Sequence, residues 1–108
     1  MDKSKNYLFI CAFGQSRSKY FAERCMNAGF KSMFCGYTED ADFVLASNHF
    51  KWADVVVILD KDFKREKELW SDMIDHRKPF VKFFLDDEPS LFDKNFAKMI
   101  KCINKVAP

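Results

Sequence analysis

The apolar residues of this chain are arranged in two kinds of pattern. Runs in which nearly every residue is apolar cover residues 7–11 and 55–59, and such runs are typical of strands that are buried on both faces of a parallel sheet. Residues 18–28 instead mix apolar side chains with Lys, Glu and Arg, and Gly29 follows them. A glycine in that place is a common helix end. We therefore expect a strand, a loop and a helix in the first part of the chain.

The rest of the pattern predicts the other elements. We expect a second strand over residues 31–35, a helix that reaches to about Phe50, a third strand over 55–59, a charged helix over 63–73, a fourth strand over 80–85 and a last helix over 93–105. Strands that alternate with helices indicate an α/β fold with a parallel sheet. A length of 108 residues allows one hydrophobic core, so residues 1–108 are expected to form one domain.

Composition narrows the class of protein. Hydrophobic residues make up 48% of the chain and charged residues 31%, which is typical of globular proteins and not of disordered or membrane-embedded ones. The net charge is +2 and the basic residues form no block, so composition does not indicate a nucleic-acid binder. No signal peptide is recognisable, and no apolar run approaches the roughly 18 residues that span a bilayer. We expect a cytoplasmic protein that does not contact membranes.

Cysteine and histidine spacing argues against a metal site. The cysteines are widely spaced and form no C-x-x-C pair, which disfavours a zinc site and a disulfide scaffold; they are Cys11, Cys25, Cys35 and Cys102. His49 and His76 have no potential ligand partner three or four residues away. We expect both histidines at the surface, and neither a metal nor a cofactor.

The segment most indicative of chemistry runs from Cys11 to Ser18 and reads C-A-F-G-Q-S-R-S. It lies between the first strand and the first helix, where open α/β sheets bind ligands and where free backbone N–H groups point at one spot. Five residues between Cys11 and Arg17 let the loop curl around an anion, with the sulfur at its floor and the guanidinium gripping two oxygens. The pattern predicts a phosphate-binding loop.

The residue types in this loop suit covalent phosphoryl chemistry. Cys11 near a cation and a helix N-terminus would be a nucleophilic thiolate, and Gly14 allows a tight curl. Ser18 could donate its hydroxyl to the sulfur or cap the helix. We expect the substrate to be bound by the loop and by a rim residue after the second strand, that is by Ala12, Phe13, Gly14, Gln15, Ser16, Ser18 and Tyr37. The alternative is that Cys11 is a core thiol and Arg17 a surface residue.

Several segments together resemble the low-molecular-weight protein tyrosine phosphatase family, in its short bacterial-type form. They are Phe9-Ile10-Cys11 with Arg17-Ser18, Cys35-Gly36-Tyr37, residues 52–61 and residues 85–89. The resemblance implies a flavodoxin-like, doubly wound sheet of four parallel strands in the order 2-1-3-4, with helices on both faces. It also implies a cysteinyl-phosphate mechanism.

The chain departs from that family at three places. Gly14 stands where the family usually has Asn, Ser16 stands where many members have a second Cys, and the acidic loop after the fourth strand is shorter. The resemblance also implies a general acid in this loop. If Asp93 is the N-cap of the last helix, the family's acid falls six residues earlier, at Asp87. Counting forward from the strand places it at Asp86, which remains the alternative.

The function expected is hydrolysis of a phosphate monoester by Cys11, Arg17 and Asp87. The resemblance favours a phosphotyrosine protein as substrate, whereas the short chain also suits a small phosphoester, a nucleotide, or a terminal or cyclic RNA phosphate. Two alternatives use the same loop. One is an arsenate reductase-like enzyme, in which Cys35 would relay a disulfide, and the other is a non-catalytic phosphate-binding module. The sequence does not indicate an oligomeric state.

Overall fold

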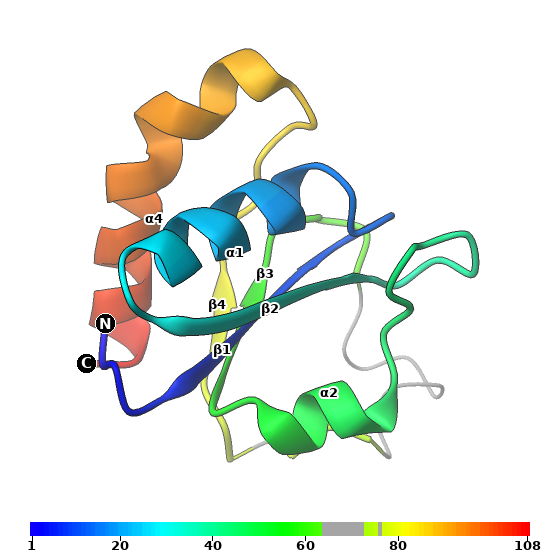
Figure 1. Cartoon of the computed structure of the whole chain (residues 1–108), viewed down its shortest axis with the longest axis horizontal. Coiled ribbons are helices and arrows are strands. Elements are labelled where there is room, and N and C mark those ends of the chain that lie inside the picture. The colour runs from blue at the N-terminus through cyan, green and yellow to red at the C-terminus, as the bar shows by residue number, and fades with distance from the viewer. Residues whose placement is uncertain (64–72, 76) are drawn as a thin grey trace.

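The computed structural model describes residues 1–63, 73–75 and 77–108, and all structural statements below concern these residues (Figure 1). Its elements are β1 (Asn6–Cys11), α1 (Arg17–Asn27), β2 (Lys31–Gly36), α2 (Ser47–Trp52), β3 (Val55–Ile58), β4 (Phe80–Lys82), the 3₁₀ turn η1 (Pro89–Leu91) and α4 (Phe92–Val106). Most of the charged helix expected over 63–73, and His76, lie outside the described residues.

The four strands form one sheet in the order β2-β1-β3-β4, and every neighbouring pair is parallel. β1 lies between β2 and β3, with Ile10 opposite both Cys35 and Ile58. Since the carboxyl ends of parallel strands meet at one edge, the segments that follow Cys11 and Gly36 start side by side. The predicted α/β class and the strand order 2-1-3-4 are confirmed.

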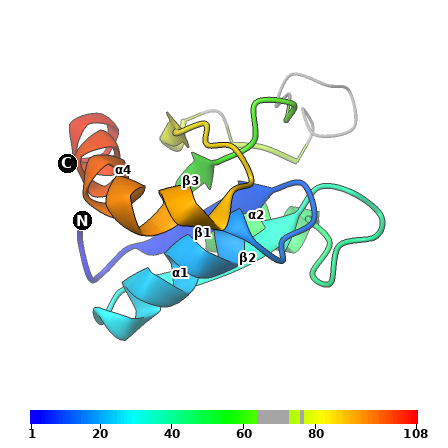
Figure 2. The ribbon, with the colours of Figure 1, turned by 90° about the horizontal axis from the view of Figure 1, so that it is seen from above.

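The two faces of the sheet bury different halves of the apolar runs. Successive strand residues point to opposite faces, so Tyr7 and Phe9 pack in a core with α1 and α4, whereas Leu8 and Ile10 pack in a second core with α2. Figures 1 and 2 show α1 and α4 on one side of the sheet and α2 on the other. Helices on both faces explain why the central strands are continuously apolar.

Several element boundaries differ from the expectation, and the differences at β4, α2 and α4 are described here. β4 ends at Lys82 and not at residue 85, although the N–H groups of Phe83 and Leu85 still bond to carbonyls of the β3 segment. The helix expected to end near Phe50 covers only Ser47–Trp52. The last helix begins at Phe92, so Asp93 lies in its first turn and is not its N-cap.

His49 was expected at the surface, and this expectation is wrong. The residue is buried, and its Nδ1 accepts a hydrogen bond from the Ala46 N–H at 3.0 Å. The His49 side chain therefore satisfies a backbone N–H at the start of α2. Burial lowers the pKa of His49. Helical register, which turns His49 and the adjacent Phe50 toward the core, outweighs the polarity of the surrounding sequence.

Candidate phosphate-binding site

The segment predicted to bind phosphate forms a loop at the carboxyl end of β1, directly before α1 (Figures 1 and 2). The Cys11 sulfur is buried at the base of this loop. The Gly14 N–H donates to it at 3.3 Å, and the Ser18 hydroxyl lies 3.1 Å from it. Ser18 thus faces the sulfur from the first turn of α1. Of its two expected roles, the structure shows the contact with the sulfur and not the helix cap.

Backbone contacts with the end of β2 hold the loop in shape. The N–H groups of Tyr37 and Thr38 donate to the carbonyls of Cys11 and Ala12, at 3.1 and 3.0 Å. Gly14 adopts a φ of +66°, and a Cβ there would lie 2.7 Å from the Gly36 nitrogen. A Cβ on Gly36 would in turn lie 2.5 Å from the Phe13 carbonyl carbon. Two glycines are needed because backbone packs against backbone at this point.

Several N–H groups of the loop are left without acceptors. Among the described residues, no partner is found for the backbone N–H groups of Ala12, Phe13, Gln15 and Ser16. The first N–H groups of α1 are also unpaired within the helix, as at every helix N-terminus. Free donors around a sulfur atom form a concavity that suits an anion.

Arg17, the cation of the loop, is held on two sides. One terminal nitrogen lies 3.1 Å from the Asp60 carboxylate, and the other donates to the Leu85 carbonyl at 2.9 Å. Its Nε–H is buried and forms no hydrogen bond with any described residue. Arg17 is therefore anchored by groups from the segments that follow β3 and β4, while its buried Nε–H has no hydrogen bond among the described residues and could donate one to a ligand.

The acidic loop after β4 approaches the site through one residue. An Asp87 oxygen lies 3.9 Å from Arg17 Nε, and the side chain is half exposed. Asp86 has no recorded contact with the phosphate-binding loop, and Asp93 instead bonds to Arg24 and Tyr20 between α1 and α4. Because Asp93 is not an N-cap, the count that pointed to Asp87 fails. The proximity of Asp87 to Arg17 is a separate reason to prefer it.

Two aromatic side chains were expected at the rim. Phe13 is 50% exposed and so is available to a ligand at the mouth of the loop. Tyr37 is partly buried and packs against the Phe63 ring, with centroids 5.7 Å apart. Burial, together with the nearby Asp60 carboxylate, raises the pKa of Tyr37 to about 12. Tyr37 thus packs beside Asp60 below the mouth of the loop. Phe13 is the more exposed of the two rim residues.

Asp60 is a residue of this site that the sequence analysis did not single out. It is buried, binds Arg17 through one oxygen, and accepts the Asp62 N–H through the other at 2.8 Å. The available signal was its position: it follows the central apolar run, at the edge where parallel strands present ligand-binding groups. A charged residue at that point could have been selected by this rule alone.

The side chains of Cys11 and Cys35 lie in the cores on opposite faces of the sheet. Cys11 belongs to the core beneath α1, whereas Cys35 belongs to the core on the α2 face. Burial raises the pKa of Cys35. This placement disfavours the disulfide relay that an arsenate reductase-like mechanism would need. Within the described ranges, no three His, Cys, Asp or Glu side chains are grouped so that they could hold a metal ion.

No family model matches this chain. No curated protein matches it either. Among solved structures, the chain is similar to the crystal structure of a predicted fructose-specific IIB protein from Escherichia coli, with a TM-score of 0.59 and 16% identity over 94% of this chain and 88% of that one. The likeness shows a shared fold and nothing finer. Membership of the low-molecular-weight tyrosine phosphatase family stays a prediction. None of the described helices is long and apolar enough to cross a membrane.

Proposed function

We propose that this protein hydrolyses phosphate monoesters through a phosphocysteine formed on Cys11. The observation that carries the proposal is the surroundings of the sulfur. It lies at the base of a loop with N–H groups that have no acceptor among the described residues, close to a buried Arg17 Nε–H that likewise forms no hydrogen bond with them. Such donors bind a phosphate dianion and stabilise the further charge on its equatorial oxygens in the transition state. A core thiol with no such role would not need an anion-binding loop around it.

The reaction has two steps. In the first, the Cys11 sulfur attacks phosphorus, the S–P bond forms, and the bond to the leaving oxygen breaks as Asp87 gives that oxygen a proton. In the second, the Asp87 carboxylate takes a proton from water, which attacks phosphorus and releases inorganic phosphate and the Cys11 thiolate. Ser18, whose hydroxyl lies beside the sulfur, stabilises the thiolate as it departs.

The decisive experiment is a substrate panel assayed with the wild-type protein and with Cys11→Ser. The panel contains p-nitrophenyl phosphate, a phosphotyrosine peptide, a 3′-phosphorylated nucleotide, a 2′,3′-cyclic nucleotide, and arsenate with thiol. We expect Cys11→Ser to lose turnover and to keep its affinity for inorganic phosphate, because most donors are backbone N–H groups. Full activity in this variant would remove the nucleophile. A phosphocysteine that accumulates without phosphate release would show transfer to an acceptor other than water.

The assignment of the general acid predicts a dependence on the leaving group. An acid matters most when the leaving oxygen is a poor leaving group, so Asp87→Asn should slow an alkyl or nucleoside phosphate by about 10²–10⁴-fold and p-nitrophenyl phosphate much less. Asp86→Asn is the matched control, since it changes the neighbouring carboxylate in the same loop. A selective loss in Asp86→Asn, or equal losses on both substrates in Asp87→Asn, would take the role away from Asp87.

A further inference from the structure

The acidic loop between β4 and α4 is held at both ends by side chains of α1. At the start of the loop, the Arg17 guanidinium donates to the Leu85 carbonyl at 2.9 Å. At its end, one Asp93 carboxylate oxygen accepts hydrogen bonds from the Tyr20 hydroxyl at 3.2 Å and from a terminal nitrogen of Arg24 at 2.5 Å. One helix therefore contacts both the phosphate-binding loop and the two ends of the acidic loop.

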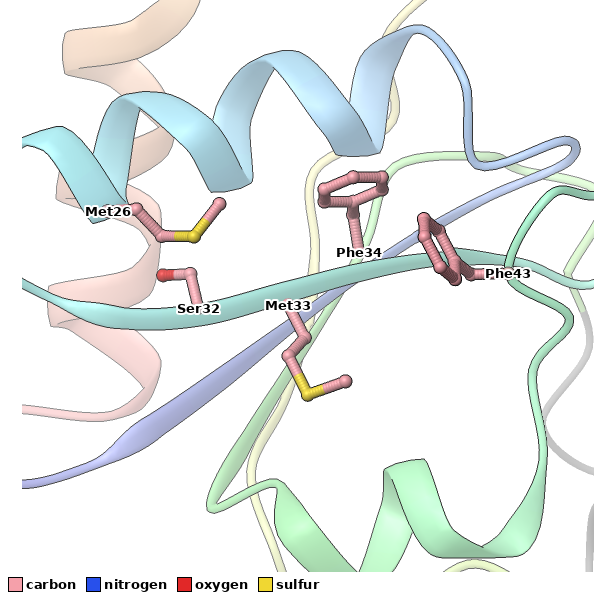
Figure 3. Close-up of a pocket in the computed structure, with 5 residues that line it drawn as sticks. All are labelled: Met26, Ser32, Met33, Phe34 and Phe43. Carbon is pink, nitrogen blue, oxygen red and sulfur yellow. The ribbon is translucent and has the colours of Figure 1, made fainter.

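Helical register places the α1 residues of these contacts on one side of the helix. Arg17, Tyr20 and Arg24 follow one another at intervals of three and four residues, so their side chains lie on the same face. The opposite side carries Met26, which lies beside Phe34 of β2 in an apolar groove (Figure 3). Different sides of α1 thus contact β2 and the acidic loop.

Aromatic rings support the contact at Asp93. The Tyr20 ring packs on the buried Phe92 ring, with centroids 5.3 Å apart. The Arg24 guanidinium carbon lies 4.0 Å from the centroid of the Phe96 ring. A guanidinium that stacks on a ring and bonds to a carboxylate is held in one orientation. The first turn of α4 is therefore fixed against α1 by polar and aromatic contacts together.

Backbone hydrogen bonds connect Asp87 to this first turn. The Glu88 N–H, directly after Asp87, donates to the Asp86 carbonyl at 2.8 Å. The Leu91 N–H then donates to the Glu88 carbonyl at 2.9 Å, and the Asn95 side chain donates to the Leu91 carbonyl at 2.7 Å. These bonds fold the segment into successive turns, so a shift at the start of α4 also moves Asp87.

Asp87 depends on such support because its own contacts are weak. Its side chain is half exposed, and its oxygen lies 3.9 Å from Arg17 Nε, which is longer than a hydrogen bond. A general acid acts only within hydrogen-bond reach of the leaving oxygen. A misplacement of about 1 Å can lower a rate on the order of 10²-fold.

We propose that Arg24 and Tyr20 are positioning residues, which fix the acidic loop through Asp93 so that Asp87 can protonate the leaving oxygen. The inference rests on the proposed function. Within the described ranges, the side-chain hydrogen bonds of Arg24 and Tyr20 go to each other and to Asp93. Neither side chain is part of the anion-binding loop, so both should affect proton delivery and leave phosphate affinity unchanged.

The test compares Arg24→Met with the wild type on a good and a poor leaving group. Methionine keeps an unbranched apolar side chain near Phe96 and removes the guanidinium. We expect kcat/KM for an alkyl phosphate to fall by roughly 3- to 10-fold, because exposed ion pairs and cation–π contacts are individually weak. Turnover of p-nitrophenyl phosphate and inhibition by inorganic phosphate should stay near the wild-type values. Tyr20→Phe, which keeps the ring beside Phe92, should show a smaller loss of the same kind. Lys98→Met is the control, since it removes a positive charge from an exposed position of α4 that makes no ion pair with the described residues.

A double-mutant cycle separates positioning from a general loss of structure. In an Asp87→Asn background, Arg24→Met should cause no further loss on the alkyl phosphate, because the acid that it positions is already absent. The same loss in both backgrounds, or equal losses on the two substrates, would overturn the positioning role. A selective loss in Asp87→Asn without one in Arg24→Met and Tyr20→Phe would overturn that role alone. The absence of a selective loss in Asp87→Asn would overturn the general acid, and the positioning role with it.

Discussion

Arg17 shares its guanidinium between the buried Asp60 carboxylate and the Leu85 carbonyl. Asp60 follows β3 and Leu85 follows β4, whereas the loop follows β1, so the position of the cation depends on the segments after three strands at once. Hydrogen bonds to charged groups contribute about 1.5–3 kcal/mol each. The geometry of the candidate anion site therefore depends on Asp60 as much as on the loop.

Asp60→Asn tests this dependence. The amide keeps the shape of the side chain but removes its charge, so we expect kcat/KM for p-nitrophenyl phosphate to fall by roughly 10- to 100-fold, which corresponds to the loss of one such bond. Asp62→Asn is the matched control, because Asp62 bonds to Asp60 through its backbone N–H alone. Equal activity in the two variants would mean that Arg17 is held well enough without the ion pair.

At the scale of elements, the critical contact is between the phosphate-binding loop and the end of β2. Gly36 has an ordinary φ, but a Cβ there would press on Phe13, on the Ala12 carbonyl and on Ala41. Gly36→Ala should therefore displace the loop between Cys11 and Ser18, and under the proposed function we expect it to lower kcat/KM by more than about tenfold, or 1.4 kcal/mol. Turnover of p-nitrophenyl phosphate measures this effect.

Gly29→Ala is the control for Gly36→Ala. Gly29 has a φ of +92°, so a side chain strains the end of α1, yet the nearest atoms belong to the flexible Lys3 side chain. We expect a loss of stability of at least about 0.4–1 kcal/mol with kcat/KM retained. If both variants lose activity in proportion to their loss of stability, the contact between the loop and β2 has no specific role.

For the whole molecule, buried titratable groups predict instability at alkaline pH. Burial raises the pKa of Cys25 from 9.0 to about 11, and burial with Asp60 raises that of Tyr37 from 10.0 to about 12. Each raised pKa means that the folded state holds its proton more tightly than the unfolded state. Their contributions to stability are complete below pH 9 and are lost as the pH rises to 11 for Cys25 and to 12 for Tyr37.

Urea unfolding at pH 8, 10 and 12 measures this loss. The urea midpoint should fall with each step, and Cys25→Ala should flatten the decrease between pH 8 and 10 by removing one of the groups that titrate there. A Cys25→Ala protein whose midpoint falls as steeply as that of the wild type would show that this thiol does not couple folding to pH.

The sequence by itself determined the sheet and the position of the loop that forms the candidate site. Continuous apolar runs identify strands buried on both faces, and their alternation with helices leaves a parallel sheet as the natural arrangement. The C-A-F-G-Q-S-R-S segment identified the loop, because a cysteine, an arginine and a glycine at that spacing are defined by local chain geometry. Element ends were less certain: β4, α2 and α4 begin or end elsewhere because packing decides where pairing stops.

What only the tertiary structure decided are the contacts between residues far apart in the chain. Asp60 meets Arg17 across 43 positions and the Leu85 carbonyl meets it across 68, and no local pattern records such pairs. Strand register decides that Cys11 and Cys35 lie in the cores on opposite faces of the sheet. Helix register within the folded molecule decides that His49 is buried. Periodicity indicates which residues share a face, but the approach of separate elements decides what each face meets.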